Sequence, residues 1–378
     1  MSREGRFEAW LPGPLDAPAR AAIDRLAATA DVRAVAIMPD AHLAGEVCVG
    51  TVVATRSTLL PEAIGGDIGC GVLAQRFEGQ AAVLQDEHVA ARIMAGLYQM
   101  VPEARHVRRQ VLPERLARAE LEEARLVAAL ERQGGVQLGT LGRGNHFVEF
   151  QESDDDGRLW VAVHTGSRAF GQAVLEAHLP KATVTETGLR RLDAETLEGG
   201  HYLADMGVAL AYADANRRTI MAAVVELVNT VLRFAPDSIR EISCVHNFVR
   251  HETHGGEELW VHRKGAISAC FGEPGIVPGS MGTPTFHVEG RGCERSLCSS
   301  SHGAGRIMTR SEARRRIGVR ELHRQLRGVW FDERRANALR DEAPGAYKDI
   351  GRVMRAQAEL TKIVRRLRPV LSYKGAGS

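Results

Sequence analysis

Short apolar runs bounded by turn-forming residues predict buried strands along much of the chain. Residues 34–40 (AVAIMPD) and 47–55 (VCVGTVVAT) have this pattern near the N-terminus. Farther along, 159–167 (LWVAVHTGS) and 241–249 (EISCVHNFV) each predict a strand that runs into a loop. The pattern over 258–269 (ELWVHRKGAISA) predicts two strands or a hairpin.

Apolar positions three and four residues apart predict helices in three regions. The first extends from about residue 81 to residue 132, with breaks near Pro102 and Pro113, because proline lacks the backbone N–H that a helix interior needs. The second is one long helix over 205–234. The third covers 344–368 and precedes an extended end, LSYKGAGS.

The order of these elements and the size of the chain predict the fold class. Strands and helices are interleaved without the regular spacing of βαβ units, which favours an α+β fold. The chain has 378 residues, of which 44% are hydrophobic, and this is enough for a sizeable core. We expect a single domain over 1–378, with mixed or antiparallel sheets and helices around a deep cleft.

The charge balance restricts how the chain binds polyanions. A net charge of +2 gives no field over the whole protein that attracts nucleic acid, so any such site must be a local patch. The candidates are 309–328 (TRSEARRRIGVRELHRQLRG), which contains seven arginines, and 365–368 (RRLR). Arginine runs often form solvated helix faces, so contact with phosphate stays an open alternative for both.

The first residues and the cysteines indicate a cytoplasmic protein. The segment MSREGRFEAW has no apolar core of a secretory signal, and no apolar run approaches the roughly 18 residues of a membrane span. In the reducing cytosol we expect the six cysteines to be free thiols or metal ligands.

Five glycine-rich segments stand beside histidine, cysteine or serine residues. Glycine allows positive φ and close approach of the backbone to a ligand. If these loops converge, they form a cleft lined with backbone N–H groups, which suits phosphate. The segments are GGDIGCG (65–71), GTLGRGNHF (139–147), HTGSRAFG (164–171), PGSMG (278–282) and SHGAGR (301–306).

Candidate metal ligands lie in or near these loops. One carboxylate, one thiol and three imidazoles are enough for two metal ions if the thiolate bridges them. A histidine is more often an ordinary polar residue than a ligand, and a lone cysteine is often a core residue. Thiolate and imidazole ligands favour zinc or another transition metal without selecting manganese. The candidates are Asp67, Cys70, His146, His164 and His246.

Nine segments in this order resemble the RtcB family of RNA ligases, and the resemblance extends from about Met38 to Lys374. They are MPDAH (38–42), GGDIGCGV (65–72), GRGNHFVEF (142–150), VHTGSR (163–168), HNF (246–248), HRKGA (262–266), PGSMG (278–282), SHGAGR (301–306) and DEAPGAYKDI (341–350).

The resemblance implies a role for each matching residue. Asp67, Cys70 and His146 would hold one Mn²⁺, and Cys70, His164 and His246 a second one. His302 would be the histidine that becomes guanylylated, and glycines 303 and 305 would turn backbone N–H groups toward phosphate. The residues that match GMP or GTP contacts are Asn145, His146, Phe147, Val148, Glu149, His246, Asn247, Pro278, Gly279, Ser280, Met281, Thr285, His302, Gly303, Ala304, Gly305 and Lys374.

The family's activity follows as an expectation. GTP would be the co-substrate, and RNA with a 3′-phosphate or 2′,3′-cyclic phosphate end would be joined to RNA with a 5′-hydroxyl end, in RNA repair or tRNA splicing. A GMP–histidine and an RNA-(3′)pp(5′)G end would be the intermediates. Two other functions use parts of the same residue set: a binuclear-metal RNA phosphodiesterase or phosphohydrolase, and a non-catalytic RNA- or GTP-binding protein.

Overall fold

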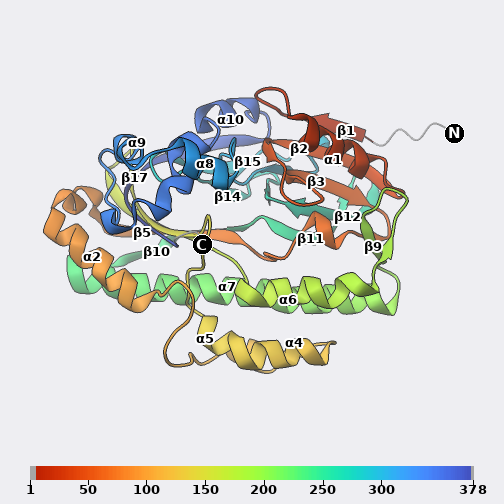
Figure 1. Ribbon diagram of the computed structural model, residues 1–378, viewed down its shortest axis with the longest axis horizontal. Helices are drawn as coiled ribbons and strands as arrows, with labels where there is room; N and C mark the ends of the chain where they lie inside the picture. The colour runs from red at the N-terminus through yellow and green to blue at the C-terminus, as the bar shows by residue number, and fades with distance from the viewer. Residues whose placement is uncertain (1–5, 376–378) are drawn as a thin grey trace.

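Two large sheets form the upper part of the molecule, and helices cover them from below (Figure 1). The computed structural model describes residues 6–375; residues 1–5 and the last three residues of the expected extended end lie outside that part. Within it, strands and helices mix without regular βαβ units, which confirms the predicted α+β class.

The first sheet has five strands and the second has seven. In spatial order, the first contains β1 (Arg6–Ala9), β2 (Val32–His42), β3 (Val49–Thr55), β12 (Glu257–Lys264) and β11 (Asn247–His254). The second contains, also in spatial order, β10 (Pro236–Val245), β5 (Gly71–Gln80), β7 (Arg158–Thr165), β6 (Phe147–Ser153), β17 (Thr361–Lys374), β15 (Thr285–Gly290) and β14 (Pro274–Val277). Among these described strands β1 and β2 pair in parallel, and the other pairs are antiparallel.

Two smaller sheets complete the strand inventory of the described residues. One pairs β13 (Ala266–Ser268) with β16 (Ser299–Ser301), and the other contains β4 (Thr58–Leu59), β9 (Arg190–Asp193) and β8 (Thr183–Val184). The segment 258–269 does form two strands, β12 and β13, but they do not pair with each other as a hairpin. Gly265 separates them with a φ of 63°, and each pairs within a different sheet.

The segment 241–249 corrects the prediction of one strand that ends in a loop. It contains the end of β10 and the start of β11, and only His246 lies between them. β10 belongs to the seven-stranded sheet and β11 to the five-stranded sheet. The apolar pattern is continuous because both strands are partly buried, and this hides the change of sheet. His246 therefore lies at the junction of the two sheets.

The predicted C-terminal helix over 344–368 is wrong for most of its length. Only α10 (Ile350–Ala356) is an α-helix, and the chain then enters the 14-residue strand β17. β17 lies between β6 and β15 and forms hydrogen bonds with both. Ladder bonds on both edges favour the extended form despite the helix-forming arginines, because tertiary pairing overrides weak local propensity.

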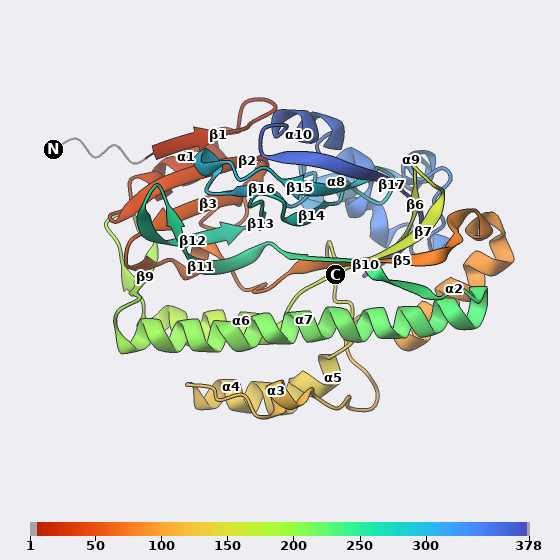
Figure 2. The ribbon, with the colours of Figure 1, turned by 180° about the vertical axis from the view of Figure 1, so that it is seen from behind.

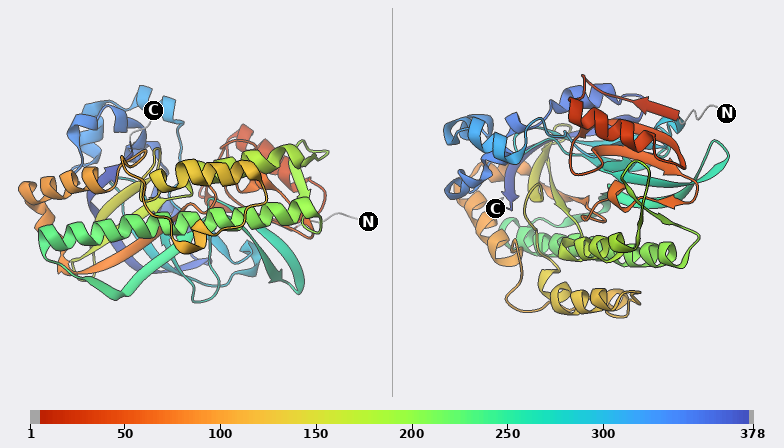
Figure 3. Two further views of the ribbon diagram at one scale, coloured as in Figure 1. Left: turned by 90° about the horizontal axis from the view of Figure 1, so that it is seen from below. Right: turned by 45° about the vertical axis from the view of Figure 1, so that its right-hand side comes forward.

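The helices form layers on the sheets. α6 (Arg168–His178) and the 36-residue α7 (Leu197–Leu232) run side by side under the strands, and α4 (Ala124–Ala129) and α5 (Gly135–Gln137) lie farther out (Figures 1 and 2). α2 (Glu87–Met100) packs along the far end of α7, as the view from below shows (Figure 3). The remaining α-helices are α1 (Ala17–Ala27), α3 (Glu114–Ala117), α8 (Arg310–Arg316) and α9 (Val319–Gln325).

α7 begins eight residues before the predicted start. Thr196 caps it by accepting from the Gly199 amide, and the chain leaves it through Arg233 in the left-handed region, at φ 61°. Gly199 and Gly200 weaken the helical pattern of the first turns. No helix within residues 6–375 is both long and apolar enough to cross a membrane.

The helical stretch predicted over 81–132 is interrupted at both prolines as predicted, but it is less continuous than expected, because residues 101–113 and 118–123 are not helical. α2 stops at Met100, two residues before Pro102, and α3 begins at Glu114, directly after Pro113. The apolar faces of α2 and α7 enclose a core with the seven-stranded sheet, and this core includes Phe77, Phe150 and Leu227. This core therefore supports the seven-stranded sheet from one face. The residues at the ends of its strands project on the opposite side.

Candidate functional site

A cavity opens where the two large sheets meet, and all five glycine-rich segments contribute to its wall. The predicted convergence of these loops is thus present in the structure. The cavity is lined by His42, Val49, Asp67, Cys70, Asn145, Phe147, Glu149, His164, His246, Asn247, Gly265, Pro278, Gly279, Ser280, Met281, His302, Gly303, Ala304, Gly305, Arg306, Arg310, Tyr347 and Lys374.

The five candidate metal ligands lie together at one end of this cavity. They form two groups of three, Asp67–Cys70–His146 and Cys70–His164–His246, and within each group the ligand atoms lie within 4.8 Å of one another. The Cys70 Sγ is 3.3 Å from the His164 Nε2 and 3.6 Å from the His146 Nε2. Cys70 belongs to both groups, so its position suits a thiolate that bridges two ions.

The strand register explains why the ligands meet. His164 lies in β7 and pairs with Val72 of β5 and Phe147 of β6, so Cys70 and His146 stand just before the two flanking strands. The His246 amide donates to the Cys70 carbonyl at 2.9 Å, which brings the sheet junction to the same point. Ligands far apart in sequence therefore come from adjacent strand ends.

Backbone carbonyls orient two of the imidazoles for ligation. The His146 Nδ1 lies 3.0 Å from the Leu141 carbonyl oxygen, and the His164 Nδ1 lies 3.1 Å from that of Asn145. An Nδ1–H that donates to a carbonyl leaves Nε2 as a lone-pair donor facing the cluster. This arrangement of donors fits a bound transition-metal ion.

Burial and close neighbours set the charges within the cluster. Burial lowers the pKa values of His164 and His246 well below the usual range, so both imidazoles are neutral, as ligation requires. Burial and the adjacent Asp67 raise the pKa of Cys70 well above its usual range. Burial opposes ionisation of Asp67, but the contacts with His146, Cys70 and His164 together outweigh it and lower the pKa to about 2. A divalent cation would supply the charge that favours the Cys70 thiolate.

His302 projects into the cavity beside the cluster, and Asp40 holds it. The Asp40 Oδ2 lies 2.7 Å from the His302 Nδ1, and Asp40 is completely buried. The centroid of the His302 ring is 4.6 Å from that of His246. With Nδ1 directed at Asp40, Nε2 is the nitrogen left for bond formation. The MPDAH motif contains Asp40, but sequence reasoning did not select this residue.

The SHGAGR loop packs against the backbone around Asp40. A Cβ on Gly305, which has a φ of 75°, would come within 2.2 Å of the Asp40 carbonyl oxygen, so only glycine fits there. The Gly303 amide donates to the Asp40 Oδ2 at 3.3 Å. This corrects the expectation that the Gly303 amide points toward phosphate, since the buried carboxylate is its partner.

The start of β6 and the end of β17 add an aromatic ring and buried charges to the cavity wall, and the centroid of the Phe147 ring lies 5.2 Å from that of the His164 ring in the cluster. The Glu149 carboxyl accepts from the Gln151 Nε2 at 2.8 Å, and burial raises the pKa of Glu149 to about 8. Lys374 forms an ion pair with Glu342, and its Nζ is 5.7 Å from the Phe147 ring centroid. The last residues of β17 thus reach the cavity, and this part of its wall can recognise a flat polar ring.

Three residues expected to contact the nucleotide do not line the cavity. Val148 alternates with Phe147 and Glu149 along β6, so its side chain packs into the core under the sheet. The Thr285 hydroxyl is buried and accepts from Gln151, which in turn donates to Glu149. His146 faces the ligand cluster behind the cavity wall. For the Val148 side chain to contact a nucleotide directly, β6 would have to rotate so that its core face pointed into the cavity.

α7 supplies two buried polar residues that the sequence analysis missed. The Asn216 Oδ1 accepts from the amide of Gly139 at 2.7 Å, and its Nδ2 donates to the carbonyl of Gly166 at 3.2 Å. The Arg217 guanidinium donates to the carbonyls of Gly69 at 2.6 Å and Thr165 at 3.0 Å. These two side chains tie together the three loops that carry Asp67, Cys70, His146 and His164. A polar pair within an otherwise apolar helix pattern was the available signal.

The arginine-rich segments divide into two kinds. In the 309–328 segment, Arg310 lines the cavity beside Arg306 of the SHGAGR loop, and it also contacts Asp341 at 2.9 Å and Glu342 at 2.6 Å. In the 365–368 segment, Arg366 and Arg368 pair with Asp154 on the surface. Only the first kind places a guanidinium at the cavity.

Comparisons with known proteins agree with this geometry. The family model "tRNA-splicing ligase RtcB" matches residues 23–133 and 114–375. The RNA-splicing ligase RtcB of Escherichia coli (strain K12) is 36% identical, with 97% of this chain and 96% of the relative covered. The RNA-splicing ligase RtcB2 of Escherichia coli (strain ATCC 25922) is 30% identical over 94% and 92% of the two chains. The tRNA-splicing ligase RtcB of Nanoarchaeum equitans is 34% identical over 65% and 61%.

Proposed function

Because this chain belongs to the RtcB family, we propose that it is a GTP-dependent RNA ligase that joins a 3′-phosphate or 2′,3′-cyclic phosphate RNA end to a 5′-hydroxyl end. One observation carries the proposal: His302 lies in the cavity wall with its Nδ1 directed at the buried Asp40, beside the ligand His246. A hydrolase that never stores a nucleotide does not need a histidine held in this way.

His302 would act as the nucleophile in the first step. Its Nε2 attacks the α-phosphorus of GTP, an N–P bond forms, and the bond to pyrophosphate breaks. Positive charge develops on the ring as Nε2 becomes substituted. The buried Asp40 stabilises that charge through the 2.7 Å contact with Nδ1.

A 2′,3′-cyclic phosphate end is first hydrolysed by water, which breaks the bond between phosphorus and the 2′-oxygen and leaves a 3′-phosphate. The next two steps transfer GMP to RNA and then release it. An oxygen of the RNA 3′-phosphate attacks the phosphorus of the His302–GMP adduct, which breaks the N–P bond and gives an RNA-(3′)pp(5′)G end. The RNA 5′-hydroxyl then attacks the 3′-phosphorus, forms the phosphodiester and releases GMP. Arg306 and Arg310, at the cavity wall, are placed to pair with phosphate oxygens in these steps.

Asp67, Cys70, His146, His164 and His246 would hold two divalent metal ions, for which the family resemblance favours Mn²⁺. Bound metal would neutralise charge on the transferring phosphate. Guanine would lie in the part of the cavity where Phe147 offers a ring for stacking and Glu149 a carboxyl for the base edge.

The test of this function follows label from [α-³²P]GTP into the protein. We expect an acid-labile, alkali-stable protein–GMP adduct with Mn²⁺ in the native chain and none in His302→Ala. The variant keeps all five proposed ligands, so its metal content is expected to match the native chain. It should also seal RNA that already carries a ppG end, since that step uses no histidine nucleophile.

Two results would count against the proposal. An adduct at native yield in His302→Ala would show that another residue carries GMP. Metal-dependent cleavage of a 2′,3′-cyclic phosphate by the native chain, with no adduct and no joined RNA, would favour a binuclear-metal phosphodiesterase.

A further inference from the structure

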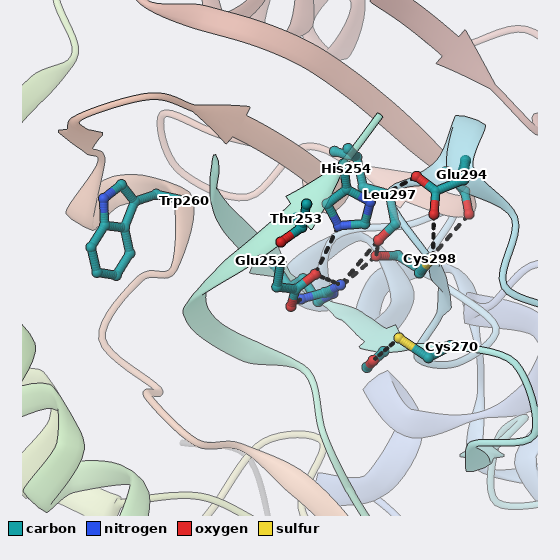
Figure 4. A network of polar contacts seen from close by, with 12 residues as sticks. Glu252, Thr253, His254, Trp260, Cys270, Glu294, Leu297 and Cys298 are labelled. Atoms are coloured by element: carbon teal, nitrogen blue, oxygen red, sulfur yellow. Dashed lines mark hydrogen bonds and ion pairs between the residues drawn. The ribbon is translucent and has the colours of Figure 1, made fainter. Parts of the chain in front are cut away.

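A second cluster of ligand-type side chains lies outside the cavity, beside the small sheet formed by β13 and β16. Its members are Glu252 and His254 of β11, together with Glu294 and Cys298 from the segment before β16 (Figure 4). Cys270, two residues after the end of β13, lies on the same side. None of these residues belongs to the proposed metal centre around Cys70.

His254 is held between two carboxylates, one on each ring nitrogen (Figure 4). The His254 Nε2 is 3.0 Å from the Glu252 Oε2, and its Nδ1 is 3.2 Å from the Glu294 Oε2. Arg263, which is fully buried, donates two hydrogen bonds to the Glu252 carboxylate, at 2.6 and 3.0 Å. The Glu252 carboxylate is therefore fixed, and it fixes the ring of His254.

The hydrogen bonds with Glu252 and Glu294 raise the pKa of His254, so a cation would have to displace the proton on Nδ1 when it binds. The contact with Glu252 is one that metal-binding histidines also make. A ligating imidazole usually donates its other N–H to a carboxylate, which sets the tautomer and directs the free nitrogen at the metal. With Nε2–H donated to Glu252, the His254 Nδ1 faces Glu294 and Cys298. The three ligand atoms of His254, Glu294 and Cys298 lie within 4.8 Å of one another.

We propose that His254, Glu294 and Cys298 bind one Zn²⁺-type cation, with Glu252 as the orienting carboxylate. A thiolate, an imidazole and a carboxylate are the donors that zinc takes in proteins, and hard cations such as Mg²⁺ avoid thiolate. His254 and Cys298 are buried, and the Glu294 side chain is about 59% exposed, so the site has one open side for metal entry.

Cys270 is placed to be the fourth ligand. Burial, with the nearby Cys270 thiol and the Glu294 carboxylate, raises the pKa of Cys298 to about 12. Without a cation the Cys298 thiol stays protonated, and cation binding displaces its proton to solvent. Cys270 is exposed, and its thiol lies 3.7 Å from the Ser268 hydroxyl, a contact that it would leave in order to reach the cation.

The backbone at Cys298 belongs to a hydrogen-bonded turn, in which the Leu297 amide donates to the Glu294 carbonyl at 3.1 Å and the Cys298 amide to the Cys293 carbonyl at 3.0 Å. Leu297 and Cys298 both have positive φ, at 53° and 45°, although neither is glycine. Conformations of this kind cost about 1–3 kcal/mol each and persist where the surrounding structure or a ligand requires them. They turn the Cys298 Sγ toward Glu294, with 3.8 Å between the Sγ and the Oε1.

The position of this proposed site would give the cation a structural role near His302. Cys298 directly precedes β16, and His302 directly follows it, while β13 pairs with β16 from Ala266 to Ser268. A cation shared by Cys298 and Cys270 would close the end of this strand pair opposite His302. The peripheral site would thereby restrain the strand that positions the nucleophile.

The experiment uses Co²⁺ as the probe, since Co²⁺ takes zinc ligands and gives a near-ultraviolet charge-transfer band only with thiolate. The protein titrated is the metal-free Cys70→Ala variant, because this substitution removes the thiolate of the proposed metal centre around Cys70. We expect this variant to show a thiolate–Co²⁺ band that saturates at one ion per chain. Cys70→Ala/Cys298→Ser should lack the band, and Cys70→Ala/Cys48→Ser is the matched control, because Cys48 is a buried thiol outside both clusters.

A second substitution separates ligand loss from misfolding. Glu294 is largely exposed, so Cys70→Ala/Glu294→Gln should keep the unfolding temperature of metal-free Cys70→Ala while binding Co²⁺ roughly tenfold or more weakly. No thiolate band in Cys70→Ala, or a band that survives Cys298→Ser, would overturn the proposal. The same holds if Glu294→Gln leaves the affinity unchanged. The readout needs neither GTP nor RNA, so it is independent of the ligase proposal.

Discussion

Replacing Asp40 with asparagine tests how much the buried carboxylate contributes to the reactivity of His302, the proposed nucleophile. One oxygen of Asp40, Oδ2, accepts from the His302 Nδ1 at 2.7 Å and from the amides of His302 and Gly303 at 3.2 and 3.3 Å. Its Oδ1 is buried without a hydrogen-bond partner among the described residues. In Asp40→Asn, either the amide nitrogen faces Nδ1 and enforces the wrong tautomer, or it occupies the Oδ1 position without an acceptor.

The expected loss follows from the geometry of this contact. A hydrogen bond to a charged group is worth about 1.5–3 kcal/mol. The pair is shielded from solvent, since the side chains of Asp40 and His302 are 0% and 14% exposed. Because about 1.4 kcal/mol corresponds to a tenfold change in rate, guanylylation should slow by about 10- to 150-fold. Metal binding should not change, since Asp40 is not among the proposed ligands.

The assay is the single-turnover rate of [α-³²P]GMP incorporation at saturating GTP and Mn²⁺. Asp205→Asn is the matched control, because Asp205 and His178 form a fully buried pair at 2.7 Å away from the cavity. We expect Asp205→Asn to reduce stability and to keep the native rate for each folded molecule. A native rate in Asp40→Asn, with its unfolding temperature unchanged, would refute the role of Asp40.

Two further outcomes follow from the cavity. Cys70→Ala should lower metal occupancy in both groups of ligands, measured by elemental analysis after gel filtration. Cys244→Ala, which removes a partly buried thiol outside both groups, should not lower it, and two ions retained in Cys70→Ala would exclude a bridging thiolate. Guanosine affinity, measured by calorimetry, should rise with pH up to about 8 and then level off, because guanine N–H groups favour ionised Glu149 and burial raises its pKa to about 8. Glu149→Gln should remove this dependence, and an equal slope in the variant would assign it elsewhere.

The fold was predictable where local pattern and final environment agree. The strands around residues 34–40 and 47–55 were predicted, and so were the helix breaks at Pro102 and Pro113, since apolar runs and proline geometry act locally. β17 was not, because its extended form depends on partners more than 70 residues away in sequence, such as β15. The change of sheet at His246 was also hidden, because a strand pattern does not specify which sheet it joins.

The sequence predicted the candidate site residues whose side chains line the cavity. It did not predict the residues that only position other parts of the site. Glycine-rich loops marked the cavity residues, and the structure brings the five candidate ligands together. Asp40 and Arg217 have no glycine-rich neighbourhood and act on His302 and on loop carbonyls. A buried charge is costly unless it is paired, so each one merits a search for its partner, but burial is a property of the fold.

The cavity lies between two sheets, so the part of the site with the proposed metal ligands and the part with the proposed nucleophile depend on each other. The Cys70, His146 and His164 ligands come from the ends of the seven-stranded sheet, whereas Asp40 lies in β2 of the five-stranded sheet. His246 belongs to both halves, because its amide donates to Cys70 and its carbonyl accepts from the Ala266 amide at the start of β13. A shift of one sheet against the other would therefore move the proposed nucleophile away from the proposed metal ligands, unless His246 moved as well. The single-residue junction at His246 and the hydrogen bond from the Gly69 amide to the Asn247 carbonyl, at 2.9 Å, both oppose such a shift.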